Sequence, residues 1–129
     1  MTRVIVDGMN VIGSRPDGWW RDRDGAARRL FGRLERYARL HGLDVLLVLD
    51  GAAKAEWHLE GLVEVVFARD EGFRTADDAI VALVERELAP ETMEVVTSDR
   101  ELASRVRAAG ATVSGPRALL DALDADQRG

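Results

Sequence analysis

The feature that most constrains the fold of this chain is a pair of unbroken apolar runs, "VIV" at residues 4–6 and "VLLVL" at residues 45–49. A strand with one face in water alternates apolar and polar residues, whereas unbroken runs indicate strands buried on both faces, as in a parallel sheet covered by helices. Three more short apolar runs are also typical of strands. The five predicted strands span residues 3–7, 44–50, 62–68, 93–98 and 111–114.

Helical periodicity fills the connections that follow the first, third and fourth strands. Apolar residues recur there every three or four positions, and Gly42, Pro90 and Gly110 follow as stop signals. A last helix is expected after Pro116, with a frayed tail from about residue 124 to 129. The longer predicted helices span about residues 24–41, 76–88 and 99–109. This alternation predicts a single α/β domain over residues 1–129, with a parallel sheet and helices on both of its faces.

The bulk composition favours a cytoplasmic protein with no membrane-spanning segment. No apolar run approaches the ~20 residues that cross a bilayer. The N-terminus lacks a secretory signal pattern, and the absence of cysteine excludes disulfides and thiolate metal sites. The formal net charge of −5 is unevenly distributed, because residues 15–39 carry eight arginines against four acids. The position of the remaining acids therefore becomes the main functional clue.

Three of the predicted strands end in an aspartate, since Asp7, Asp50 and Asp99 follow the first, second and fourth runs. Parallel strands present their carboxyl ends at one edge of the sheet, which is where open α/β sheets bind ligands. Asp77 and Asp78 in "TADD" open the helix after the third strand, so they are expected at the same edge. Each aspartate taken alone could be a turn or helix-cap residue. Their gathering at one edge favours a shared site.

Crowded carboxylates repel one another, and their pKa values rise unless a cation is present. Without those five aspartates the chain holds 18 acids and 18 bases, so the whole net charge can be assigned to them. An all-oxygen donor set favours Mg²⁺ or Mn²⁺ over zinc. The two histidines, His41 and His58, are expected at the surface. Asn10 could act as a neutral ligand or hold a metal-bound water, and Gly8 is expected to adopt an unusual φ and to leave room beside the site.

Four stretches in this order, "VDGMNVIG", "LLVLDG", "TADDAI" and "VVTSDREL", resemble the NYN branch of the PIN-like nuclease superfamily. The greatest likeness is to the bacterial YacP-like ribonuclease group, although Met9 stands where many relatives carry an aromatic residue. The resemblance implies a PIN-like three-layer α/β/α sandwich with a mostly parallel five-stranded sheet in the order 3-2-1-4-5. That order would place the first strand between the second and the fourth.

The same resemblance implies a metal-dependent endoribonuclease that leaves 5′-phosphate and 3′-hydroxyl ends. In this reading Asp7 and Asp99 would hold the principal Mg²⁺ or Mn²⁺ ion, and Asp78 would orient water or a second ion. Spacing alone does not separate Asp77 from Asp78, because neighbouring helix residues point ~100° apart. The implied metal-site positions are Asp7, Asn10, Asp78 and Asp99, with Asp77 and Asp50 secondary, and the implied assisting hydroxyls are those of Thr97 and Ser98.

The segment 13–25, directly after Asn10, combines arginines with two tryptophans, which suits phosphate neutralisation and stacking on unpaired bases. The expected partner is RNA, either single-stranded or ribosome-associated mRNA. The tryptophans could instead anchor the loop on the core or form a homodimer contact. Arg69 and Arg74 form a second candidate rim for RNA, or could instead be solvated loop residues. The predicted RNA-binding side chains are Arg15, Trp19, Trp20, Arg21, Arg23 and Arg74.

The main alternative is a catalytically silent RNA-binding or protein-interaction module of the same fold, although no deletion among the acids points to it. A response-regulator receiver also gathers aspartates at strand ends, but it needs a late lysine and the only lysine here is Lys54. A haloacid-dehalogenase-type phosphatase needs Asp-x-Asp after its first strand, where this chain has Asp-Gly-Met-Asn. Neither the dinucleotide-binding glycine pattern nor a P-loop is present.

Overall fold

The computed structural model describes residues 2–128 and shows one five-stranded sheet in which every neighbouring pair of strands is parallel. The strands are β1 (Arg3–Asp7), β2 (Asp44–Leu49), β3 (Glu64–Phe67), β4 (Met93–Val96) and β5 (Thr112–Ser114). Their order is β3-β2-β1-β4-β5, so the predicted order is confirmed and β1 lies between β2 and β4.

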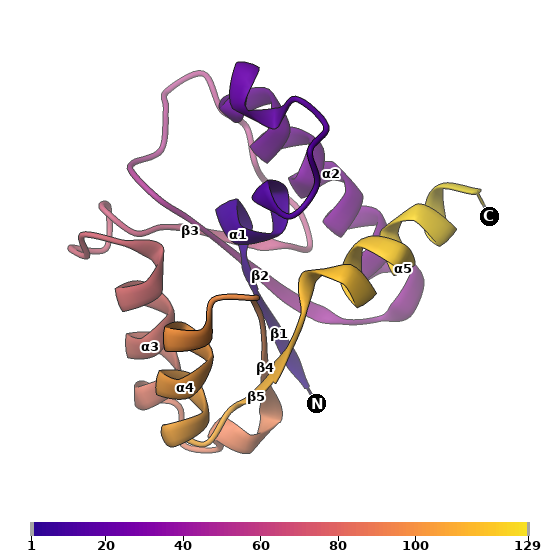
Figure 1. The fold of residues 1–129 in the computed structure, drawn as a ribbon. Helices are drawn as coiled ribbons and strands as arrows, with labels where there is room; N and C mark the ends of the chain where they lie inside the picture. The colour runs from indigo at the N-terminus through magenta and orange to yellow at the C-terminus, as the bar shows by residue number, and fades with distance from the viewer. Residues whose placement is uncertain (1, 129) are drawn as a thin grey trace.

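Helices form a layer on each face of this sheet. They are α1 (Gly8–Gly13), α2 (Arg23–His41), α3 (Ala76–Arg86), α4 (Arg100–Ala108) and α5 (Pro116–Arg128), with short 3-10 turns η1 (Trp19–Arg21) and η2 (Pro90–Thr92). One face is covered by α1, α2 and α5, and the other by α3 and α4, which confirms the three-layer α/β/α sandwich (Figure 1). No helix within the described residues is both long enough and apolar enough to cross a membrane.

Burial on both faces explains the unbroken apolar runs. Along β1, Val4 and Val6 belong to the core beneath α2 and α5, whereas Ile5 belongs to the core beneath α3 and α4. Residues 45–49 of β2 alternate in the same way and are all buried. Successive side chains of a strand point to opposite faces, so a strand covered on both sides is apolar at every position.

Side-chain caps start two helices at the carboxyl edge of the sheet. The Thr75 hydroxyl accepts a hydrogen bond from the Asp78 N–H at 3.2 Å, where α3 begins. The Asp99 carboxylate accepts one from the Leu102 N–H at 3.0 Å, where α4 begins. Each cap satisfies a backbone donor that has no partner within its helix. The first turns of α3 and α4 therefore lie at the edge where the site is predicted.

The expectation of an unusual φ at Gly8 is wrong. Gly8 has no positive φ and opens α1, an additional short helix, directly after β1. Its lack of a side chain matters for another reason: a Cβ atom here would lie 2.6 Å from Leu49 Cδ2 and 2.9 Å from the Val48 carbonyl oxygen. The close approach of α1 to β2 therefore requires glycine at this position.

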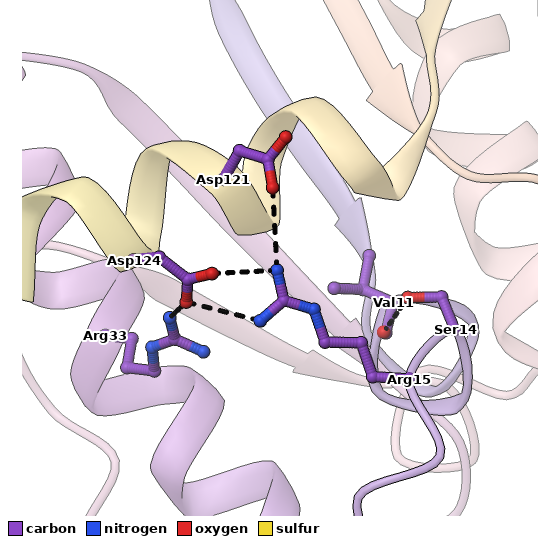
Figure 2. A network of polar contacts seen from close by, with 6 residues as sticks. All are labelled: Val11, Ser14, Arg15, Arg33, Asp121 and Asp124. Atoms are coloured by element: carbon purple, nitrogen blue, oxygen red, sulfur yellow. Dashed lines mark hydrogen bonds and ion pairs between the residues drawn. The ribbon is translucent and has the colours of Figure 1, made fainter.

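The predicted frayed tail is also wrong, because α5 continues to Arg128, and only the last residue of that tail lies outside the described residues. Its Asp124 carboxylate accepts hydrogen bonds from Arg15 at 2.9 Å and from Arg33 at 2.5 Å (Figure 2). These two arginines hold the pKa of Asp124 below its ordinary value. Ion pairs and buried leucines thus bind α5 to α2 and to the loop after α1.

Candidate functional site

A buried carboxylate, that of Asp7, lies at the end of the central strand β1 and is only 4% exposed. The Thr97 hydroxyl donates a hydrogen bond to Asp7 Oδ2 at 2.9 Å, and its oxygen accepts one from the Asp99 N–H at 3.1 Å. The register that pairs Val6 with Val96 leads on to Asp7, the last residue of β1, and to Thr97, which directly follows β4. The ends of β1 and β4 are therefore joined by a short chain of hydrogen bonds.

Burial raises the pKa of Asp7 from its ordinary value of 3.8 to about 6. The hydrogen bond from Thr97 opposes this rise, while the negative charges of Asp77, Asp50 and Asp99 add to it. These three acids come from α3 and from the ends of β2 and β4, as the strand-end pattern predicted. We refer to Asp7, Asp50, Asp77 and Asp99 as the acid cluster.

Asp77 and Asp78 occupy different surroundings, although they are adjacent on α3. Burial raises the pKa of Asp77, and the other acids at this edge raise it further. The Asp78 Oδ1 atom instead lies 3.3 Å from a guanidinium nitrogen of Arg105 on α4. Asp77 is among the charges that raise the pKa of Asp7. The two residues that spacing alone left equivalent thus have different surroundings, although Arg105 also acts on Asp77 and lowers its pKa.

Two members of the acid cluster also accept hydrogen bonds from helix backbones. Asp50 Oδ1 accepts one from the Ala76 N–H at 2.8 Å, and Asp99 Oδ1 accepts one from the Leu102 N–H at 3.0 Å. Asp50 and Asp99 therefore each accept a hydrogen bond from the first turn of a helix and also belong to the acid cluster. Within residues 2–128, no group of three His, Asp or Glu side chains is arranged to hold a metal ion.

Asn10, on α1, is held against the residues that follow β4. Its Oδ1 atom accepts hydrogen bonds from the Ser98 N–H at 2.8 Å and from the Ser98 hydroxyl at 3.0 Å. A backbone N–H can only donate, so the amide oxygen is already engaged and the amide nitrogen is the group left to meet a ligand. The structure therefore brings these two predicted site residues together.

A groove of about 480 Å³ opens beside Asp50, and we call it the Trp19–Trp57 groove after the two indoles that line it. Trp19 also packs against the core, and the Arg23 guanidinium lies 5.3 Å from the centroid of its ring. Arg69 lines the same groove. The sequence interpretation missed Trp57 because the irregular connection around it has no periodicity that would place it at this edge.

The other predicted RNA-binding side chains are divided between structural and exposed positions. Arg15 is engaged by Asp124 of α5, so it holds the fold together. Trp20 is 51% exposed, and the Arg21 guanidinium lies 6.0 Å from its ring centroid. Arg74 is exposed just before α3. Trp20, Arg21 and Arg74 therefore remain accessible to a ligand.

A family model described as the YacP-like NYN domain matches residues 4–129, a range that contains the whole candidate site. The crystal structure of Rae1 (YacP) from Bacillus subtilis is 27% identical to the chain, with a TM-score of 0.81 over 99% of this chain and 76% of that one. The structure of a tryptophan-to-leucine mutant of that protein is also 27% identical, with a TM-score of 0.77 over 99% and 78% of the two chains. None of the curated proteins matches the chain.

Proposed function

The chain belongs to the YacP-like NYN domain family, and from this membership we propose that it is a metal-dependent endoribonuclease that hydrolyses phosphodiester bonds in single-stranded RNA. The observation that carries the proposal is the buried Asp7 at the carboxyl edge of the sheet, whose pKa is raised by burial and by the three acids around it. Burying one carboxylate among others costs stability. Such perturbed groups in clefts are typical of functional sites.

The acid cluster suits Mg²⁺ or Mn²⁺, because hard divalent cations prefer oxygen ligands. Asp7, Asp77 and Asp99 would have to draw together around the ion, with Asp50 beside them, because within residues 2–128 no three acids are already arranged to hold one. When bound, it would supply charge neutralisation at the phosphate and a water of lowered pKa. Asp78, which the motif had implied as a principal position, takes an outer place in this proposal.

The protein's own side chains would position the reacting groups. The Thr97 hydroxyl restrains the Asp7 carboxylate, and Ser98 restrains Asn10 through two hydrogen bonds. The free amide nitrogen of Asn10 can donate to a phosphate oxygen or to the attacking water. Groups that are held in place before the reaction lower its entropic cost.

The Trp19–Trp57 groove supports single-stranded RNA as the substrate. Its indoles offer faces on which unpaired bases can stack, and Arg23 and Arg69 can neutralise phosphates. The exposed Trp20 and its neighbouring arginine extend these properties beyond the groove. Bases in a duplex are already stacked, so such a surface favours unpaired strands.

The proposal is tested by cleavage of a labelled single-stranded RNA in Mg²⁺, in Mn²⁺ or in EDTA. Wild type should cleave with either ion and not in EDTA, and Asp7→Asn should lose roughly 100-fold or more in rate. Asp44→Asn is the matched control, since Asp44 is an exposed aspartate at the opposite end of β2 from Asp50. Cleavage that survives both Asp7→Asn and EDTA would refute the proposal.

A catalytically silent RNA-binding module is the second candidate. It is favoured by the absence, among the residues described, of three side chains arranged to hold an ion. It predicts that wild type binds RNA without cleaving it in either ion, and that Asp7→Asn binds with equal affinity.

A further inference from the structure

A second groove, of about 500 Å³, opens on the other side of Asp7. We call it the β4–β5 groove, because it lies where β4 and β5 end, whereas the Trp19–Trp57 groove lies where β2 ends. Since β1 lies between β2 and β4, the end of β1 with Asp7 separates the two grooves. The polar walls of the β4–β5 groove are formed by Thr97, Ser98, Arg100, Arg107 and Ser114.

The two arginines of this groove have no role in holding the fold together. Arg100 and Arg107 are exposed, and within residues 2–128 neither forms an ion pair. They lie seven residues apart on α4 and therefore share one side of the helix. Arg105, on a different side, pairs with Asp78. Arg100 and Arg107 thus present two free positive charges close to a cluster of negative ones.

The chemistry of the β4–β5 groove differs from that of the Trp19–Trp57 groove. No aromatic side chain from the described residues lines it. Guanidinium and hydroxyl groups bind phosphate oxygens well, whereas recognition of unpaired bases relies on aromatic stacking surfaces. The groove is therefore suited to the backbone of a nucleic acid and not to its bases.

We propose that the β4–β5 groove binds the sugar–phosphate backbone of an RNA strand, with Arg100 and Arg107 neutralising its phosphates. The inference rests on the proposed function in taking RNA as the ligand, and it adds a site across the acid cluster from the Trp19–Trp57 groove. A strand that occupied both grooves would cross the edge of the sheet between the ends of β2 and β4, where β1 ends at Asp7. The two grooves together would set the path of the substrate across the acids.

The test is the affinity of a fluorescent single-stranded RNA of roughly 12 nucleotides, measured by anisotropy in EDTA so that cleavage does not interfere. The variant is Arg100→Gln/Arg107→Gln. The matched control is Arg39→Gln/Arg128→Gln, which removes two exposed arginines near the C-terminal ends of α2 and α5. Those ends lie together, away from the acid cluster, as the hydrogen bond between His41 and Asp126 shows.

The groove variant should bind RNA roughly tenfold more weakly at low salt. The logarithm of its association constant should also fall less steeply with the logarithm of salt concentration, with a slope shallower by about 1.4, or ~0.7 for each lost phosphate contact. The control should bind like wild type. The loss should be equal for adenine-only and uracil-only RNA, because phosphate contacts carry no base information. Circular dichroism should show unchanged folding for both variants, since all four arginines are exposed.

Unchanged affinity and salt slope in the groove variant would overturn the inference, as would an absence of RNA binding by wild type. An equal loss in the control would also overturn it, because that loss would reflect overall charge alone. Cleavage by wild type is a separate measurement. A protein that binds RNA through the groove without cleaving it would refute the proposed function and support the groove. Cleavage by wild type together with unchanged RNA affinity in Arg100→Gln/Arg107→Gln would support the proposed function and refute the groove.

Discussion

At the scale of one residue, the charge of Asp7 destabilises the folded protein. Burial disfavours its charge, and three neighbouring acids disfavour it further. The hydrogen bond from the Thr97 hydroxyl opposes these effects by stabilising the carboxylate. At neutral pH and without a cation, ionised Asp7 therefore lowers the free energy of unfolding.

This cost predicts that Asp7→Asn is more stable than wild type at neutral pH. Folding raises the pKa of Asp7 from 3.8 to about 6, so the folded protein holds the proton more tightly than the unfolded chain does. The resulting stabilisation is present below pH 4 and is lost as the pH rises through 6. Relative to Asp7→Asn, wild type should thus lose about 2–3 kcal/mol of unfolding free energy between pH 4 and pH 7. Urea unfolding in EDTA across this range measures the difference.

The exposed Asp44 supplies the control, because it lies outside the acid cluster and pairs with Arg3, so Asp44→Asn should not raise stability in EDTA. Mn²⁺ should narrow the difference between the Asp7 pair: at ten times its dissociation constant it should stabilise wild type by about 1.4 kcal/mol and leave Asp7→Asn unchanged. Equal stabilisation of both proteins would mean that the ion binds elsewhere. A variant that is less stable than wild type at every pH would contradict the predicted cost of burial.

At the scale of elements, the junction between β1 and α1 sets where Asn10 meets the end of β4. The chain passes directly from strand to helix at Gly8. This position touches the Leu49 side chain and the Val48 carbonyl of the neighbouring strand. The approach of α1 to β2 is therefore a matter of backbone packing, and a change in side-chain volume at Gly8 should shift the whole helix.

Gly8→Ala should lower the free energy of unfolding by roughly 1–3 kcal/mol, because the new methyl group would overlap the Leu49 side chain and the backbone of β2. Gly32→Ala is the matched control. Gly32 lies inside α2 with no atom within 4 Å of the added Cβ, so alanine there should raise stability by up to about 1 kcal/mol. Chemical denaturation measures the free energy of unfolding of both variants. If Gly8→Ala raised it as Gly32→Ala does, α1 would be able to move away from β2.

At the scale of the whole molecule, the sheet could be predicted because its signals are local. The runs at 4–6 and 45–49 reveal strands covered on both faces, whereas the strand order that the structure confirms was implied by the resemblance to the NYN family. The electrostatic cluster around Asp7 was predictable for a related reason. Parallel strands bring their carboxyl ends to one edge, so acids at strand ends meet wherever the strands are neighbours.

The parts that could not be predicted depend on contacts between distant segments. Arg15 follows the first motif, and only its pairing with Asp124, 109 residues later, shows that it is structural. The same pairing keeps the end of the chain helical where its composition suggests fraying. Trp57 lies in a connection without periodicity, so its place in a groove beside Asp50 follows from the fold alone.

The positions of the two grooves predict how the whole substrate is used. Each groove lies on its own side of Asp7, so a strand that crosses the acid cluster extends beyond it in both directions and needs no free end. Wild type with Mn²⁺ should therefore open a circular single-stranded RNA at a rate similar to that for a linear RNA of the same sequence. The first product should be the full-length linear RNA, and Asp7→Asn should leave the circle intact, which controls for contaminating nucleases. If the circular RNA survived while linear RNA was degraded, cleavage would start from strand ends. That result would refute endonucleolytic cleavage, and the acid cluster would remain the proposed catalytic site.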